Sequence, residues 1–219
     1  MCTRYISPEA GDIERHWRVG AVSPLRWAHD VFPRYTAPFI RAAKQETAYQ
    51  RELVVGTWSL IPWFAKTPKL SFPTCNARSE ELGAKASYKL PWARGQRCII
   101  PAESFFEPCW ETGKHVAWRF RPANGGLWGL AGLWNTWVCK ETGEIFESYT
   151  MLTINADGHP LMGRMHRPDP KRPPDRQDKR SVVPIPVEDV DTWLTAPPDQ
   201  AAQLVRLAPS DAFDAGPAV

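Results

Sequence analysis

Short runs of apolar residues, each filled with β-branched and aromatic side chains, dominate the chain from Leu53 to Asn155. Gly, Pro, Asn or Asp closes each run, which is typical of β-strands. The runs read LVVGTWSLIPWF, RCIIPAESFFEPCW, HVAWRFRP, LWGLAGLWNTWV and FESYTMLTIN. The polar sequences ETGK at 111–114 and ETGE at 141–144 predict hairpin turns between neighbouring runs. This part of the chain therefore predicts a mainly antiparallel sheet.

Three shorter segments carry helical spacing instead. Ser7 and Pro8 are residues that favour the start of a helix, and they predict one over 8–18. Two further patterns predict helices at about 79–93 and 187–195, the second with its apolar residues on one face.

The remaining segments are polar or rich in proline. Residues 24–38 predict irregular or extended structure, and 39–53 fits either a helix or, as we favour, two strands around a polar turn. The basic, proline-rich stretch 166–181 predicts a surface loop. The segment 198–219, rich in Ala, Pro and Asp, predicts a partly disordered tail. Since no long linker divides the chain, we expect a single domain over 1–197.

The composition says more about the compartment in which the protein works than about its function. Lys plus Arg 27 against Asp plus Glu 24 gives a net charge of +3, too small a surplus to indicate a nucleic-acid partner by itself. Five cysteines without a CxxC pair argue against a disulfide framework and predict a reducing, cytoplasmic setting. No apolar run approaches the ~20 residues that span a bilayer, so no membrane association is expected. The His and Cys residues show no metal-ligand spacing, and we expect no metal and no cofactor.

Cys2 is the first residue with candidate chemistry. If Met1 is removed, Cys2 carries an α-amine and a thiol on adjacent carbons. Their reference pKa values, about 7.7–8.0 and about 8.5, leave both partly deprotonated near neutral pH. An aldehyde can condense with the amine to an imine, and the thiolate can then close a thiazolidine ring. The alternative is that Cys2 is simply a small residue at a frayed end.

Three later stretches contain polar residues suited to the same chemistry. In CNARSE, Asn76 can orient the chain terminus and Arg78 can hold a phosphate, or Asn76 can merely cap the following helix. In PAESFFEP, Glu107 stands among aromatic residues, which predicts a raised carboxyl pKa suited to proton transfer. His166, in GRMHRPDPKR, suits proton transfer beside an anionic polymer, although a lone His is more often a surface residue.

Taken in order, the blocks MCxRY, WSLIPWF, NARSE, RCIIPA and FE and the late His166 resemble the SOS response-associated peptidase (SRAP) family over most of the chain, from residue 1 to about 185. The resemblance implies a compact α+β domain built on a mainly antiparallel, barrel-like sheet with flanking helices. It also implies a monomer that senses abasic sites in single-stranded DNA and crosslinks them through mature Cys2 in a single turnover. Autoproteolytic removal of Met1, a weak lyase activity and association with the nucleoid during DNA damage belong to the same expectation.

The resemblance assigns a role to each candidate residue. Cys2 is the nucleophile, Asn76 positions it, Glu107 is the acid and base, and His166 assists opening of the sugar ring and imine chemistry. Contacts to DNA fall to arginines, a threonine and an aromatic pair: Arg4, Trp63, Phe64, Arg78, Thr153, Arg164 and Arg167. Aromatic stacking and phosphate contacts suffice for sequence-tolerant binding of a single strand.

Two other functions stay open at this point. The first is a thiol peptidase limited to the self-removal of Met1, with Glu107 or His166 as its base. The second is a noncovalent module that binds single-stranded nucleic acid, in which Cys2 is incidental.

Overall fold

The computed structural model describes residues 1–20, 26–43 and 49–218. Its strands are β1 (Tyr5–Ile6), β2 (Asp30–Val31), β3 (Thr36–Ala42), β4 (Arg51–Trp58), β5 (Asn76–Arg78), β6 (Arg97–Ala102), β7 (Ser104–Cys109), β8 (Val116–Pro122), β9 (Trp128–Val138), β10 (Ile145–Asn155), β11 (Arg180–Val182) and β12 (Phe213–Pro217). Its α-helices are α1 (Ala10–Trp17), α2 (Ala86–Ala93), α3 (Val190–Thr195) and α4 (Pro198–Ala202).

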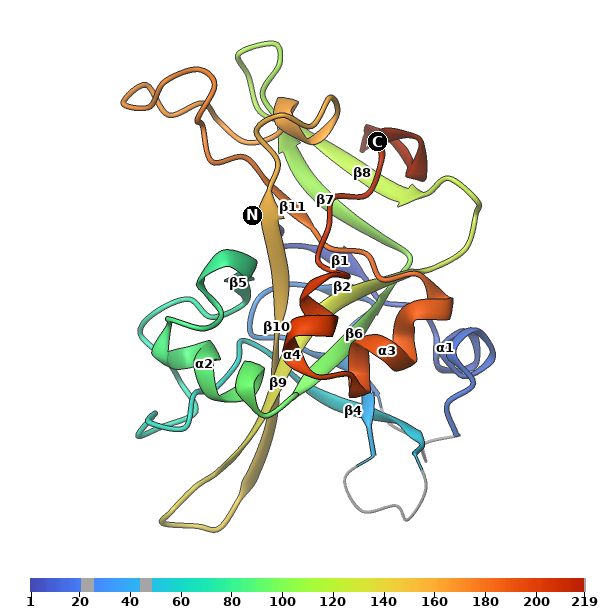
Figure 1. Cartoon of the computed structure of the whole chain (residues 1–219), viewed down its shortest axis with the longest axis vertical. Coiled ribbons are helices and arrows are strands. Elements are labelled where there is room, and N and C mark those ends of the chain that lie inside the picture. The colour runs from blue at the N-terminus through green and yellow to red at the C-terminus, as the bar shows by residue number, and fades with distance from the viewer. Residues whose placement is uncertain (21–25, 44–48, 219) are drawn as a thin grey trace.

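Five strands close into a ring in the order β9, β10, β4, β3, β6 and back to β9. The pairings are antiparallel except that β10 runs parallel to β4, and β5 adds to β10 in parallel as well. A second, wholly antiparallel sheet has the order β12, β8, β7, β1, β2. Figure 1 shows the long β9 and β10 strands, with α2 beside β9 and α3 beside β6. The fold is α+β with a mainly antiparallel, barrel-like sheet, as predicted.

Both faces of the ring strands are buried. Alternate residues of one strand belong to different clusters: Phe39 packs with Tyr5, Trp58 and Tyr149, whereas its neighbour Ile40 packs with residues of α1 and α3. This follows from the two-residue period of a strand, which sends successive side chains to opposite faces. The first cluster extends to the second sheet, and Cys2 lies within it.

The predicted strands are confirmed over most of their length. The hairpin turns at 111–114 and 141–144 join β7 to β8 and β9 to β10, both antiparallel. The segment 39–53 forms strands, since β3 and β4 pair antiparallel, while its central residues 44–48 lie outside the described residues. Residues 59–64, predicted to continue a strand, do not.

Two helix predictions are corrected in their bounds. The first helix begins at Ala10, because the Ser7 backbone N–H donates to His29 O at 2.8 Å and Ser7 is buried against the second sheet. The pattern over 79–93 splits into a 3₁₀ turn at Ser79–Glu81 and helix α2. The pattern at 187–195 forms a 3₁₀ turn followed by α3, whose apolar face is buried as predicted.

Two segments expected to be loose are built into the fold. The end of the 166–181 stretch is not surface loop, because Lys179, Arg180 and Ser181 are buried and β11 begins at Arg180. The segment 198–219, predicted to be partly disordered, contains α4 and β12, and β12 pairs with β8 over five residues. Figure 1 shows the C-terminal segment running beside β8.

Candidate active site at the amino end

Cys2 is fully buried at the start of the chain, ahead of β1. Its exposed fraction is 0%, and its thiol donates to Arg4 O at 3.4 Å. Burial and the nearby Glu107 carboxylate raise the pKa of the thiol well above its usual value. With Met1 in place, the thiol is therefore protonated at neutral pH, unlike the free aminothiol considered from the sequence.

The amino group of Met1 lies between Glu107 and His166. It is 3.1 Å from His166 Nδ1 and 3.8 Å from Glu107 Oε2. The two side chains are themselves neighbours, with His166 Nε2 3.4 Å from Glu107 Oε2. Strand β7, through Glu107, and the loop before β11, through His166, thus meet at the amino end of the chain.

Asn76 holds the other side of the Met1–Cys2 peptide bond. It stands at the first position of β5, and its Nδ2 donates to Cys2 O at 2.7 Å. The same Nδ2 lies 3.5 Å from Cys75 Sγ. The 3₁₀ turn after β5 has no side-chain cap, so the capping alternative for Asn76 does not apply. The Met1–Cys2 bond is bracketed by Asn76 on one side and by Glu107 and His166 on the other.

Burial shifts the pKa values of the two titratable partners in opposite directions. Desolvation raises the pKa of Glu107 to about 7, as its aromatic surroundings predicted, although the chain's ammonium group opposes the shift. Desolvation, together with the same ammonium group, lowers the pKa of His166 to about 4. Near neutral pH the imidazole is neutral, and the carboxyl group can both give and take a proton.

His166 is held in place by its backbone. Its φ is 61°, in the left-handed region that non-glycine residues rarely adopt. The N–H donates to Pro108 O at 2.7 Å, and the carbonyl accepts from Lys179 Nζ at 2.6 Å. These bonds fix an unfavourable conformation that turns the imidazole toward Met1 and Glu107.

Three buried acceptors in the site lack a hydrogen-bonded donor: Asn76 Oδ1 and both carboxylate oxygens of Glu107. Buried polar atoms are nearly always paired in folded proteins. The site therefore offers acceptors for hydrogen-bond donors brought by a ligand or by a new chain terminus.

Three of the predicted DNA-binding arginines pair with carboxylates in this structure, and Arg4 and Arg78 are two of them. The Arg4 guanidinium bonds both oxygens of Asp30, at 2.9 and 2.8 Å, and stacks on Phe106 at 4.1 Å. Arg78 Nη2 donates to Asp178 Oδ2 at 2.6 Å. A phosphate would compete with these carboxylates for the same guanidinium groups.

The other predicted DNA contacts differ in their exposure to solvent. Thr153, paired in register with Arg78, is fully buried, so its hydroxyl does not face a ligand here. Arg164 pairs with Glu111 and stacks on Trp118 at 4.9 Å. Arg167 is exposed and lies over the Trp110 ring at 5.5 Å.

Trp63 and Phe64 form an exposed aromatic pair in the loop after β4. Their exposed fractions are 63% and 40%, and their rings meet edge to face at 5.7 Å. Exposed aromatic rings of this kind can stack on unpaired bases. Their contact with a strand stays a prediction.

Sequence reasoning missed the residues that support the predicted ones. Asp30 and Asp178 hold Arg4 and Arg78, and Lys179 holds the His166 carbonyl. No local pattern marks these partners, because each lies far from its contact along the chain or in an irregular loop. Arg119 and Arg121 of β8 belong to none of the motif blocks, and their two-residue spacing places them on one face of a strand.

The described ranges contain neither a cluster of metal-binding side chains nor a membrane-spanning helix. Within them no three His, Cys, Asp or Glu side chains group as a metal site. In the same ranges no helix has the length and apolarity needed to cross a bilayer.

The fold agrees with the comparisons with known proteins. The family model described as SOS response associated peptidase (SRAP) matches residues 1–218, and the chain belongs to this family. It is 32% identical to the abasic site processing protein YoqW of Bacillus subtilis over 130 residues, 58% of this chain and 55% of the relative. It is 27% identical to the abasic site processing protein HMCES of Xenopus tropicalis over 179 residues, 71% of this chain and 53% of the relative. The chain therefore spans about half the length of the curated relatives that it matches.

Solved structures share the whole fold. A crystal structure of a protein from Bordetella bronchiseptica is 33% identical, covers 100% of both chains and superposes with a TM-score of 0.86. A protein from Bacteroides thetaiotaomicron, 22% identical, superposes with a TM-score of 0.75 over 98% of this chain and 90% of its own, which is a likeness of fold.

Proposed function

We propose that this protein processes abasic sites in single-stranded DNA by forming a covalent crosslink through Cys2 after Met1 is removed. The single observation that carries the proposal is the placement of the chain's amino group between Glu107 and His166, with Cys2 O held by Asn76. Family membership and two relatives named as abasic site processing proteins support it.

Removal of Met1 is the first step. Hydrolysis of the Met1–Cys2 bond adds water to the Met1 carbonyl carbon, releases methionine and frees the Cys2 amine. Glu107 is the group proposed to take the proton from water, because burial raises its pKa to about 7 and its Oε2 lies 3.8 Å from the Met1 amino group. The new Cys2 ammonium would then supply donors for the unpaired oxygens of Asn76 and Glu107.

The crosslink then forms in two steps. The Cys2 amine attacks the aldehyde of the ring-opened deoxyribose and water leaves, which gives an imine. The Cys2 sulfur adds to the imine carbon, and its proton passes to the nitrogen, which closes a thiazolidine. Because the second step is intramolecular, its effective molarity can reach roughly 10⁵ M or more. His166, neutral at pH 7, is proposed to exchange protons with the sugar hydroxyl and the imine nitrogen.

Mass spectrometry and denaturing gels test this proposal. The purified protein is expected to lack Met1. With a uracil-excised single strand it is expected to form a denaturant-resistant species whose mass is that of protein plus DNA minus one water. Cys2→Ala keeps an amine but lacks sulfur, so it is expected to form only an imine that needs borohydride to survive denaturation.

Cys139→Ala is the matched control, since it removes a thiol that lies outside the buried core. It is expected to crosslink like the wild type. A Cys2→Ala protein that crosslinks stably without borohydride would overturn the proposal. A protein that keeps Met1 and still crosslinks would contradict the proposed role of the aminothiol.

A further inference from the structure

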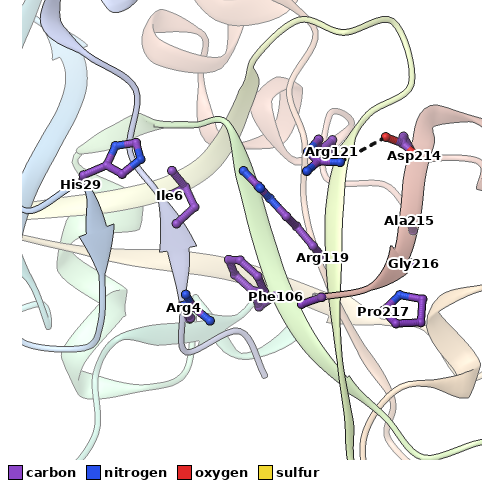
Figure 2. Close-up of a pocket in the computed structure, with 11 residues that line it drawn as sticks. Arg4, Ile6, His29, Phe106, Arg119, Arg121, Asp214, Ala215, Gly216 and Pro217 are labelled. Atoms are coloured by element: carbon purple, nitrogen blue, oxygen red, sulfur yellow. Dashed lines mark ion pairs between the residues drawn. The ribbon is translucent and has the colours of Figure 1, made fainter.

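A hollow of about 490 Å³ lies on the second sheet, on the face opposite the aromatic core. Arg4, Phe106, Arg119 and Arg121 line it, and β12 forms one wall. Figure 2 shows Phe106 of β7, Arg119 and Arg121 of β8, and Arg4 just before β1, with Arg121 turned toward Asp214. The neighbouring residues Phe105 and Phe120 point the other way, into the core.

The three arginines of the hollow differ in how they pair with carboxylates. Arg4 is fully engaged with Asp30, and Arg121 is 3.6 Å from Asp214 at a solvent-exposed position. Arg119 donates its Nε to Ser104 Oγ at 2.8 Å and, within the described residues, forms no ion pair. Burial, and then the adjacent positive charges of Arg121 and Arg4, lower the pKa of Arg119, while Glu103 opposes the shift. An anion placed among these arginines would relieve that repulsion.

The guanidinium groups are held at fixed positions. Arg4 and Arg119 lie over the same Phe106 ring, at 4.1 and 5.9 Å from its centre. Stacking on an aromatic ring restrains a guanidinium while leaving its edge free to bond an oxyanion. Arg119 is also fixed through Ser104, which is fully buried. The arrangement suits the oxygens of a phosphodiester.

The hollow adjoins the candidate active site through Arg4. The Arg4 side chain enters the hollow, while its carbonyl accepts from the Cys2 thiol at 3.4 Å and from the Phe106 N–H at 3.0 Å. Phe106 in turn precedes Glu107 on β7. A strand whose sugar reaches Cys2 would therefore carry its adjoining phosphates past Arg4 toward Arg119 and Arg121.

We propose that this hollow binds the phosphate backbone of the DNA strand beside the reacting nucleotide, with Arg119 and Arg121 as the contacting residues. The inference rests on the proposed function for the identity of the strand. It assigns binding residues on β8 that take no part in the covalent chemistry. Asp214 limits the affinity by competing for Arg121.

Salt-dependent binding measurements test the assignment. Wild type and variants are titrated with a single strand that carries a tetrahydrofuran abasic analogue, which lacks an aldehyde and so reports noncovalent binding alone. Arg119→Gln and Arg121→Gln are each expected to weaken binding about fivefold at low salt, and to reduce the slope of log K against log salt by about 0.7. Asp214→Asn, which removes the competing carboxylate, is expected to tighten binding.

Arg15→Gln is the matched control, because it makes the same charge change on exposed helix α1. Arg15→Gln is expected to bind the strand like the wild type. If it lost as much affinity as Arg121→Gln, the effect would be one of net charge, and the proposed site would be overturned. Unchanged binding by both β8 variants would also overturn it. Arg121 is about half exposed, so its variant is expected to fold even if Arg119→Gln does not.

Two further measurements distinguish a strand-binding hollow from a small-anion site and from the covalent chemistry. Extending the strand on one side of the abasic analogue is expected to raise the affinity of the wild type but not that of Arg121→Gln. If millimolar inorganic phosphate displaced the strand from the wild type but not from the β8 variants, the hollow would be a small-anion site and the assignment would be overturned. Crosslinking by the β8 variants is expected to require more abasic DNA than the wild type to reach the same yield. A wild type that fails to crosslink yet shows the β8-dependent salt slope refutes the proposed function and leaves the hollow as a phosphate site.

Discussion

The Glu107 carboxyl group and the His166 imidazole lie 3.4 Å apart, and their pKa values move toward each other's usual range. Burial is the first cause in both cases, since it disfavours whichever form carries charge. The pair can therefore hold a proton on Glu107 at a pH at which imidazole would ordinarily compete for it. This ordering suits Glu107 as the proton carrier and His166 as a neutral hydrogen-bonding partner.

Substitution of Glu107 is expected to change how stability depends on pH. The pKa of Glu107 is raised from 4.5 to about 7, so its stabilising protonated form is present below pH 4.5 and is lost as pH rises through 7. His166 has the opposite effect: its pKa falls from 6.5 to about 4, so its contribution is present above pH 6.5 and lost toward pH 4. In the wild type the two slopes offset each other.

Glu107→Gln removes only the first slope. The free energy of unfolding of the variant, relative to wild type, is expected to rise by about 2 to 3 kcal/mol between pH 5 and pH 8. Urea unfolding at several pH values measures this difference. If the amide changed the free energy of unfolding by a constant amount, the change between pH 5 and pH 8 would stay the same. A flat difference for Glu107→Gln would show that this carboxyl group does not titrate near 7.

At the scale of elements, the sequence predicts what depends on local pattern. Strands β6 to β10 follow from alternation and turn residues, and Glu107 follows from its aromatic neighbours. The parallel pairings of β10 with β4 and β5 do not, because register between distant strands leaves no trace in either strand alone. The start of α1 was misplaced for a related reason: the Ser7 N–H is taken by His29, a partner that only the fold supplies.

The same limit applies to the site. The motif blocks indicated Cys2, Asn76, Glu107 and His166, and the structure brings all four to the amino end. Motif blocks say nothing of which carboxylates hold the arginines, since Asp178 approaches Arg78 from 100 residues away. The occupation of the site by the Met1 amino group also needed coordinates.

The closure of the strand ring depends on a close approach at Gly132 of β9. A Cβ there would lie 2.6 Å from Thr150 O on β10 and 2.8 Å from Cys98 Sγ on β6. Gly132→Ala must push two neighbouring strands apart, so it is expected to destabilise the protein by about 2 kcal/mol. Thermal unfolding measures the loss. Gly158→Ala, where nothing lies within 4 Å, is the control and should melt near the wild type. Equal melting of both variants would contradict close packing of the ring at β9.

At the scale of the whole molecule, the last residues complete the second sheet. β12 is its edge strand beside β8, and its first residue, Phe213, enters the aromatic cluster of Phe105, Phe120 and Trp128. Composition predicted disorder here because Ala, Pro and Asp surround a single aromatic anchor. The burial of Phe213 in the shared core outweighs the average composition of the segment. The same strand, β12, also forms a wall of the arginine-lined hollow.

Phe213→Ala tests whether the C-terminal segment belongs to the folded core. Phe213 is 8% exposed and makes ring contacts with three aromatic residues at 5.4 to 6.3 Å. Its truncation leaves a cavity between the sheet and the core, so the free energy of unfolding is expected to fall by about 3 kcal/mol. Phe72→Ala removes the same ring from a 40% exposed position and is expected to have little effect. If denaturant unfolding showed the same midpoint for Phe213→Ala and Phe72→Ala, the segment after Pro197 would be an appendage to the fold. If only Phe213→Ala lowered the midpoint, β12 would be part of the folded core. The wall that β12 forms in the hollow would then be as rigid as the sheet that carries Arg119 and Arg121.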